Sequence, residues 1–229
     1  MIEVTLKLNE EDYRSNEAYK SLRTNIEFAG PENRVLAFTS CTENEGKSSV
    51  SLMLAKSLTE TGKKVLFIDA DLRKSVLFGK QKKAQKIKGL SHLLSGQAEL
   101  KEVVCNTEYE GLHIIFAGPV PPNPAELAGG KRFESLVEQA REQYDYVIVD
   151  TPPLGSVIDA VIIARVCDAT VLIVAANTVG YKFAQKVKAQ LEQAQCKILG
   201  VVLNKVDMKT DRYYGRYYGK YYGEYGHNK

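Results

Sequence analysis

The sequence lacks the side chains and spacings that several classes of protein require. Its cysteines form no CxxC pair and no Cys/His ligand spacing, which argues against a zinc site and against a disulfide framework. The three histidines likewise show no ligand or triad spacing. The net charge of +3 is too small to indicate a nucleic-acid partner, so none is expected.

Long apolar runs are also missing. Stretches such as residues 171–176 fall far short of the roughly 18 to 20 apolar residues that span a bilayer. The N-terminus does not show the basic and then apolar pattern of a signal peptide. We therefore expect a soluble, cytoplasmic protein, and 229 residues with 44% hydrophobic content suffice for one domain with short appendages.

What the sequence does contain is an alternation of short apolar runs with segments of helical periodicity. This alternation predicts an α/β fold with a doubly wound, mostly parallel sheet whose strands are covered on both faces. An additional helix is predicted over residues 10–28, where Leu22 and Ile26 share one face. The expected strands are residues 35–39, 65–68, 112–116, 146–149, 170–175 and 198–203.

The end of the chain has a different character. Apolar periodicity stops near Asp207, so we divide the chain into a folded domain of residues 1–206 and a flexible, disordered tail of residues 207–229. Repeats of Tyr-Tyr-Gly-charged fill the tail, and tyrosine-rich repeats alone are often only low-complexity sequence. The tail tyrosines are Tyr213, Tyr214, Tyr217, Tyr218, Tyr221, Tyr222 and Tyr225.

A phosphate-binding loop of the P-loop NTPase type is predicted between the first expected strand, residues 35–39, and the helix that follows it. Backbone N–H groups at such a turn converge on an anion, and the helix N-terminus adds partial positive charge. Lys47 can reach the β- and γ-phosphates, and the Ser48 hydroxyl can meet Mg²⁺. The pattern GxxxxGK[ST] lacks its first glycine, where Cys41 stands. The predicted nucleotide-binding residues of the loop are Asn44, Glu45, Gly46, Lys47, Ser48 and Ser49.

Two further strands end in aspartate. Parallel alignment would bring Asp69 and Asp150 to the sheet edge where Lys47 lies, and carboxylates there suit a hard cation. We predict that both bind Mg²⁺ together with Ser48, either directly or through water. Asp71, two residues beyond Asp69, is then free to orient an attacking hydroxyl or to accept its proton. The predicted catalytic residues are therefore Asp71, Lys47 and Asp69.

These motifs, in this order, resemble those of the bacterial tyrosine kinases. The resemblance rests on the phosphate loop, the Asp-Ala-Asp-Leu-Arg segment of residues 69–73, the Asp-Thr-Pro-Pro segment of residues 150–153, the Pro-Asn-Pro segment of residues 122–124 and the tyrosine cluster. It covers essentially the whole chain. The closest likeness is to the stand-alone cytoplasmic type of capsule and exopolysaccharide gene clusters, although the family loop usually reads Pro-Gly where this chain has Glu43 and Asn44.

The resemblance implies an ATP- and Mg²⁺-dependent kinase that autophosphorylates its tail tyrosines, with transfer between subunits. It also implies a transmembrane activator that recruits the kinase to the inner face of the membrane, a cognate phosphotyrosine phosphatase, and control of polysaccharide synthesis and export. Family members assemble rings through a Glu-x-x-Arg-x-x-Arg helix. The corresponding residues here are Glu17, Lys20 and Arg23, which makes a homo-oligomer and possible ring the expectation.

Three alternatives remain open on sequence alone. Asn204 to Asp207 match the NKxD pattern of GTPases, although Pro153 replaces the glycine of their Asp-x-x-Gly motif. Asn204 is predicted to lie beside a purine base. A partition or division-site ATPase would share the sheet and the aspartates, but it carries a signature lysine where this chain has Thr42. A nucleotide-gated scaffold with a sticky tail is the third alternative.

Overall fold

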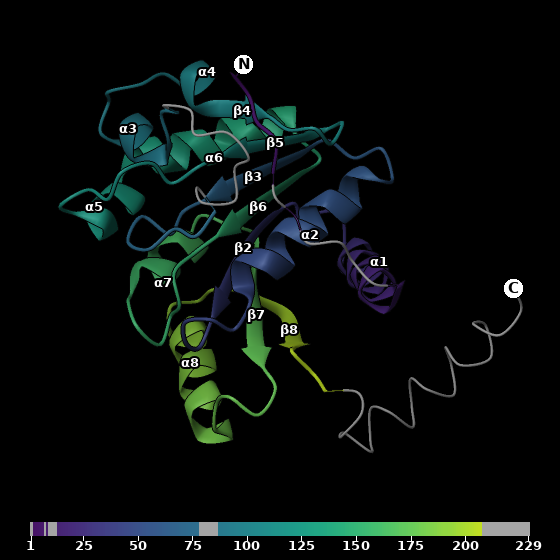
Figure 1. Ribbon diagram of the computed structural model, residues 1–229. Helices are drawn as coiled ribbons and strands as arrows, with labels where there is room; N and C mark the ends of the chain where they lie inside the picture. The colour runs from purple at the N-terminus through teal and green to yellow at the C-terminus, as the bar shows by residue number, and fades with distance from the viewer. Residues whose placement is uncertain (1, 7, 9–12, 78–86, 208–229) are drawn as a thin grey trace, which may run out of the picture.

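The computed structural model describes residues 2–6, 8, 13–77 and 87–207, which build an α/β fold around one sheet (Figure 1). Within these residues the sheet has eight strands in the order β1-β4-β5-β3-β6-β2-β7-β8. Most neighbouring strands are parallel, which confirms the predicted fold class. The strands are β1 (Ile2–Glu3), β2 (Val35–Ser40), β3 (Val65–Asp69), β4 (Val104–Asn106), β5 (Leu112–Ile115), β6 (Tyr146–Asp150), β7 (Ala169–Ala175) and β8 (Ile198–Asn204).

Helices cover both faces of this sheet, with α1 and α2 on one side and α6, α7 and α8 on the other (Figure 1). No helix within the described ranges is long and apolar enough to cross a membrane. The helices are α1 (Tyr13–Phe28), α2 (Lys47–Thr59), α3 (Leu90–Leu94), α4 (Leu100–Val103), α5 (Pro124–Ala128), α6 (Lys131–Gln143), α7 (Asp159–Ala164) and α8 (Tyr181–Gln193).

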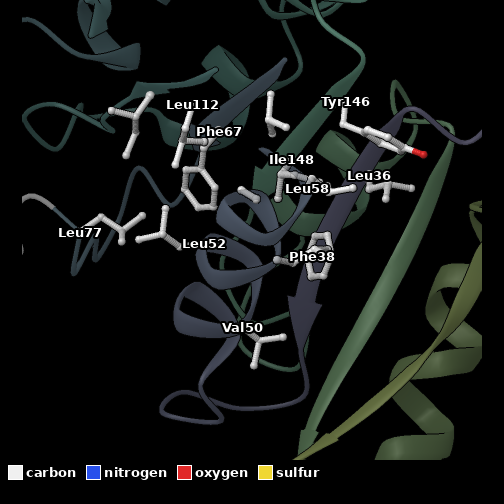
Figure 2. Packing of buried hydrophobic residues seen from close by; sticks show 14 of the residues in the cluster. Leu36, Phe38, Val50, Leu52, Leu58, Phe67, Leu77, Leu112, Tyr146 and Ile148 are labelled. Atoms are coloured by element: carbon white, nitrogen blue, oxygen red, sulfur yellow. The ribbon is translucent and has the colours of Figure 1, made fainter. Parts of the chain in front are cut away.

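Alternation along the strands divides the core between the two faces. In β2, Leu36 and Phe38 face α2, while Val35 and Ala37 pack with the helices of the other side. Figure 2 shows Leu52 of α2 in the same cluster as Phe38. Because both faces of β2 are buried, its carboxyl end and the loop that follows it are held rigidly, and this loop is the predicted phosphate loop.

The sequence missed β1 and β4, and it misjudged β8. Strands β1 and β4 have only two and three residues, too few for a periodic pattern, and β4 runs antiparallel to β5. β8 lies at the edge of the sheet, where Val201 and Leu203 are exposed, so the expectation that both of its faces are covered is wrong. A strand of valine and leucine therefore does not by itself indicate two covered faces.

Helix α1 matches the helix predicted over residues 10–28, although residues 10–12 lie outside the described part of the chain. As expected, Ile26 is buried and Leu22 packs against the same core. Residues 208–229, with all seven tail tyrosines, also lie outside the described residues. The division into a domain and a tail therefore stays a prediction.

Candidate active site

The predicted site residues converge where three neighbouring strands end. Strand β6 lies between β2 and β3, and Asp69 and Asp150 are paired positions at the carboxyl ends of β3 and β6. The loop from β2 to α2 begins at the same sheet edge, since Phe38 of β2 is level with Asp150. The parallel register thus brings Lys47, Asp69 and Asp150 to one place, as the sequence predicted.

The loop itself has the backbone shape that a phosphate site needs. Asn44 and Gly46 have φ values of 63° and 89°, both in the left-handed region, and α2 begins directly afterwards at Lys47. The first backbone N–H groups of a helix have no partner within the helix, so they are available to an anion. A side chain on Gly46 would have no room, because its Cβ would lie 2.2 Å from Nδ2 of Asn204.

The buried side chain of Glu45 stabilises this loop from the interior of the protein. Its carboxylate is buried and accepts hydrogen bonds from the backbone N–H groups of Thr42 (2.8 Å) and Ala175 (3.1 Å). The side chain of Glu45 therefore joins the loop to the end of β7. Within the predicted nucleotide site, the part of Glu45 that remains available to a phosphate is its backbone N–H.

Lys47 is held by an acidic partner. Its Nζ lies 2.8 Å from Oδ1 of Asp150 and 3.1 Å from the Ser48 hydroxyl, and the side chains of Lys47 and Asp150 are only 8% and 1% exposed. The hydroxyl of Ser51, one helical turn along α2, also donates to the same Asp150 oxygen (3.3 Å). Nothing in the spacing of the motif indicated Ser51.

Asp69 and Asp71 organise the turn after β3. One oxygen of Asp69 accepts a hydrogen bond from the backbone N–H of Asp71 (3.3 Å), and the other accepts one from the Ser75 hydroxyl. Oδ1 of Asp71 in turn accepts from the backbone N–H groups of Arg73 (3.2 Å) and Lys74 (2.9 Å). The turn therefore holds both carboxylates in fixed directions.

The buried carboxyl group of Asp69 has a perturbed pKa. Burial raises the pKa of Asp69 from its ordinary value near 3.8 to about 7, and the neighbouring Asp150 adds to that rise. The Ser75 hydroxyl and Lys47 act in the opposite direction. Such a perturbed acid at a sheet edge is typical of a functional site, and it means that the pair would gain from a bound cation.

Magnesium fits this donor set. Mg²⁺ uses one or two carboxylates together with phosphate oxygens and water, and Asp69, Asp150 and the Ser48 hydroxyl offer oxygens only. No cluster of three or more His, Cys, Asp or Glu side chains able to hold a metal occurs in the part of the chain that is described. Asp69, Asp150 and Ser48 are the residues that would hold the metal beside phosphate oxygens.

Two further ion pairs tie the surrounding loops together, and sequence reasoning did not find them. Arg73 makes a two-pronged ion pair with the buried carboxylate of Asp159 at the start of α7, with distances of 2.7 and 3.0 Å. Lys74 pairs with Glu43 of the phosphate loop (2.6 Å). Arg73 belongs to a recognised motif, but nothing in the sequence marks Asp159 as its partner.

Asn204 ends β8 beside the loop, at the position predicted to face a purine. Its Nδ2 donates to the carbonyl oxygen of Glu45 (2.9 Å). The next residue, Lys205, reaches the same loop, with its Nζ 2.5 Å from the carbonyl oxygen of Asn44. The structure therefore places Asn204 against the phosphate loop.

The predicted oligomer residues lie far from this edge, on α1. Glu17 and Lys20 form an exposed ion pair of 2.8 Å. Arg23 instead points to α2, where it donates to the backbone oxygen (2.6 Å) and the hydroxyl (3.1 Å) of Ser57. Within one chain Arg23 therefore fastens α1 to α2, and its role between chains stays a prediction.

Comparison with known proteins agrees with this geometry. A family model described as an AAA domain matches residues 34–200. The tyrosine-protein kinase CpsD of Streptococcus agalactiae is 45% identical over 194 residues, which cover 85% of this chain and 85% of that protein.

Solved structures extend the likeness to three dimensions. The kinase domain of the Escherichia coli tyrosine kinase ETK superposes with a TM-score of 0.80 at 34% identity, covering 89% of each chain. The septum site-determining protein MinD from Pyrococcus horikoshii, complexed with Mg-ADP, has a TM-score of 0.61 at 25% identity, covering 74% of this chain and 69% of that one. The sheet is thus that of a nucleotide-binding fold, and with the phosphate loop and strand-end aspartates in place, the chain belongs to the bacterial tyrosine-protein kinases.

Proposed function

We propose that this kinase binds ATP with Mg²⁺ and transfers the γ-phosphoryl group to the tyrosines of its own C-terminal tail. The observation that carries the proposal is the meeting of Lys47, Asp69 and Asp150 at the end of a phosphate loop. Mg²⁺, when bound, would supply positive charge to the β- and γ-phosphate oxygens. The catalytic roles of the residues follow from the contacts already described.

Lys47 would change partners when the nucleotide binds. In this structure its ammonium group compensates Asp150, and the same group is the one that must reach the phosphates. With Lys47 on a phosphate, the carboxylate of Asp150 would be available to hold the metal. The backbone N–H groups of the loop then stabilise charge on the transferred group, which is the larger contribution to loose phosphoryl transfer.

Asp71 would position the acceptor. A tyrosine hydroxyl has a pKa of about 10, so it must be aligned and lose its proton as transfer proceeds. Backbone N–H groups hold Oδ1 of Asp71, which fixes the carboxylate and leaves Oδ2 to accept a hydrogen bond from the phenol. Asp69 lies two residues away and is predicted to act through the metal.

Phosphorylation would reverse the charge of the tail. Residues 209–229 carry five basic and two acidic side chains, a net charge of +3. Each phosphotyrosine adds about −1.5 to −2. Modification of all seven would bring the tail to roughly −7 to −11, and repulsion between such tails would loosen an oligomer built through Glu17, Lys20 and Arg23.

The biological setting that we propose follows the family. The kinase would work in the cytoplasm, where a transmembrane activator of the polysaccharide export system recruits it to the membrane. A cognate phosphotyrosine phosphatase would reset the tail. Cycling between the two states would regulate capsular or exopolysaccharide synthesis and export. A partition or division-type ATPase is the less favoured alternative, because Thr42 stands where its signature lysine belongs.

A mixing experiment tests transfer between subunits. A Lys47→Met protein with an intact tail is incubated with ATP, Mg²⁺ and a wild-type domain truncated after Asp207, and the tail is analysed by mass spectrometry. We expect phosphate on the tyrosines of the Lys47→Met chain. An unmodified tail in this mixture, beside a modified tail in the intact wild-type protein, would reject transfer between subunits. Absence of modification in both, with the activator present as well, would reject the proposed activity.

A further inference from the structure

Two adjacent side chains at the end of β8 form hydrogen bonds with the phosphate loop, although about 160 residues separate them from it in sequence. Asn204 donates its amide N–H to the carbonyl oxygen of Glu45, at 2.9 Å. Lys205 donates its ammonium N–H to the carbonyl oxygen of Asn44, at 2.5 Å. Both bonds go to backbone atoms, so they act on the course of the loop itself.

Fixing a carbonyl group also fixes an N–H group. A peptide unit is planar and trans, so its C=O and N–H point in opposite directions. The carbonyl of Asn44 shares a peptide unit with the N–H of Glu45, and the carbonyl of Glu45 shares one with the N–H of Gly46. Lys205 and Asn204 therefore determine where these two N–H groups point, and both directions lead away from β8.

We propose that Asn204 and Lys205 are positioning residues of the phosphate loop, which hold the N–H groups of Glu45 and Gly46 toward the nucleotide phosphates. This inference rests on the proposed function, because it requires that the loop bind phosphate. It gives Asn204 a role that does not depend on the identity of the base. It also gives a role to Lys205, which in the sequence is only the second residue of an NKxD match.

The local backbone supports this role. Asn44 replaces the glycine that the family loop usually has, yet it adopts a φ of 63°, and Lys205 itself has a φ of 56°. This region is uncommon for non-glycine residues, which keep such a backbone when their surroundings determine it. The bond between Lys205 and Asn44 joins these two left-handed residues directly. Gly46 completes the arrangement, since any Cβ there would collide with the amide of Asn204.

The charge of Lys205 makes its bond stronger than an ordinary one. Hydrogen bonds with an ionised donor are roughly twice as strong as neutral ones. Lys205 is exposed, so removal of its ammonium group leaves no buried charge behind. Its substitution should therefore act on the loop and leave the fold intact.

The test compares Lys205→Met with Lys205→Arg. Methionine keeps the length of the side chain and loses the donor, whereas arginine keeps a charged donor. The matched control is Lys197→Met, which removes a partly exposed lysine that precedes the other end of β8 and bonds Asn33. Affinity is measured by titration calorimetry with ADP and, separately, with inorganic tripolyphosphate, each with Mg²⁺, and urea unfolding checks the fold.

We expect Lys205→Met to lower the affinity for both ligands by about tenfold, as the loss of one charge-assisted hydrogen bond implies. Lys205→Arg should stay within about threefold of wild type, and Lys197→Met should match wild type. If Lys205→Met binds both ligands as wild type does, the inference is wrong. If the wild-type protein binds neither ligand, the proposed function fails instead.

Asn204→Leu separates loop positioning from base recognition. Leucine has nearly the same size as asparagine and cannot donate to the Glu45 carbonyl. Loop positioning predicts weaker binding of tripolyphosphate as well as of ADP, because tripolyphosphate has no base. Weakened ADP binding with unchanged tripolyphosphate binding would show that Asn204 reads the purine, and would overturn its part in the inference.

Discussion

Two ion pairs of this chain have the same length and opposite surroundings. Lys47 and Asp150 are 2.8 Å apart at the end of the phosphate loop, where their side chains are 8% and 1% exposed. Lys20 and Glu17 are also 2.8 Å apart, on the outer surface of α1, where the side chains are 43% and 28% exposed. By distance alone, the two ion pairs would be judged equally strong.

Burial gives them different meanings. Water and salt screen the pair on α1, so it contributes little to stability. The pair at the phosphate loop has lost its water, and removing one member would leave the other charge uncompensated at a cost of about 3–5 kcal/mol. Breaking the buried pair is therefore costly in itself, and we propose that its lysine turns to phosphate when a nucleotide binds. The exposed pair is free to serve a surface contact.

The largest expected effect follows from breaking the buried pair. Lys47→Met should abolish tail phosphorylation and should also lower the free energy of unfolding of the nucleotide-free protein by about 3 kcal/mol at pH 8, because Asp150 is left alone. Urea denaturation measures the second effect. The double variant Lys47→Met/Asp150→Asn, which leaves neither charge, should recover most of the loss. Equal stability of the single variant and wild type would contradict this account of the pair.

Substitution of Asp71 tests whether this residue acts in phosphoryl transfer and not in nucleotide binding. Asp71→Asn keeps an oxygen to accept the two backbone hydrogen bonds, but the amide is a far weaker proton acceptor. We expect the rate of tail phosphorylation to fall about 100-fold with ADP affinity within twofold of wild type. Quantitative mass spectrometry and calorimetry provide the two measurements. Full phosphorylation by this variant would remove Asp71 from the mechanism.

The pH dependence of stability should report the buried carboxyl group of Asp69. The pKa of Asp69 is raised from about 3.8 to about 7 in the folded chain, so folding takes up a proton between these values. The destabilisation is absent below pH 4, grows as the pH rises toward 7, and is complete above it, by about 2–4 kcal/mol. Urea unfolding of the nucleotide-free protein at pH 5 and pH 8 should show less of this decline in Asp69→Asn than in wild type. Identical pH profiles would refute the shift.

The exposed pair should give the smallest change. Glu17→Gln should alter the free energy of unfolding by less than about 0.5 kcal/mol. If α1 forms part of a ring, however, the same variant should shift the mass measured by light scattering toward the monomer. Arg23→Ala is the contrasting variant, because it breaks the contact between α1 and α2 and should destabilise the single chain by about 1 kcal/mol or more. Loss of more than 2 kcal/mol in Glu17→Gln would show that water and salt do not screen the exposed pair.

The sequence predicted the centre of this molecule better than its rim. Strand-end residues such as Asp69 and Asp150 were predictable because parallel strands present their carboxyl ends at one edge, whatever the details of packing. The same logic could not find Asp159 as the partner of Arg73, since that contact depends on where α7 settles. It also could not show that the Glu45 side chain turns inward, because a loop sequence does not state which way each side chain points.

The edges of the sheet were hidden for a different reason. β4 has three residues, and its antiparallel pairing with β5 is decided by the fold around it. β8 reads as a covered strand, yet Val201 and Leu203 are exposed because nothing in the described part of the chain covers them. Lys205 acquires its contact with Asn44 only through this edge position.

The central place of β2 has a consequence for the making of the protein. β2 comes early in the chain, yet its partners β6 and β7 follow it by more than 100 residues, with Val35 beside Val147 and Leu36 beside Ala169. At 5 to 20 residues per second, translation needs roughly 5 to 20 s to supply the first of them. During that interval β2, whose six residues are all buried in the folded chain, has no neighbours in the sheet, so a nascent chain that stalls there is an aggregation hazard without enzymatic activity.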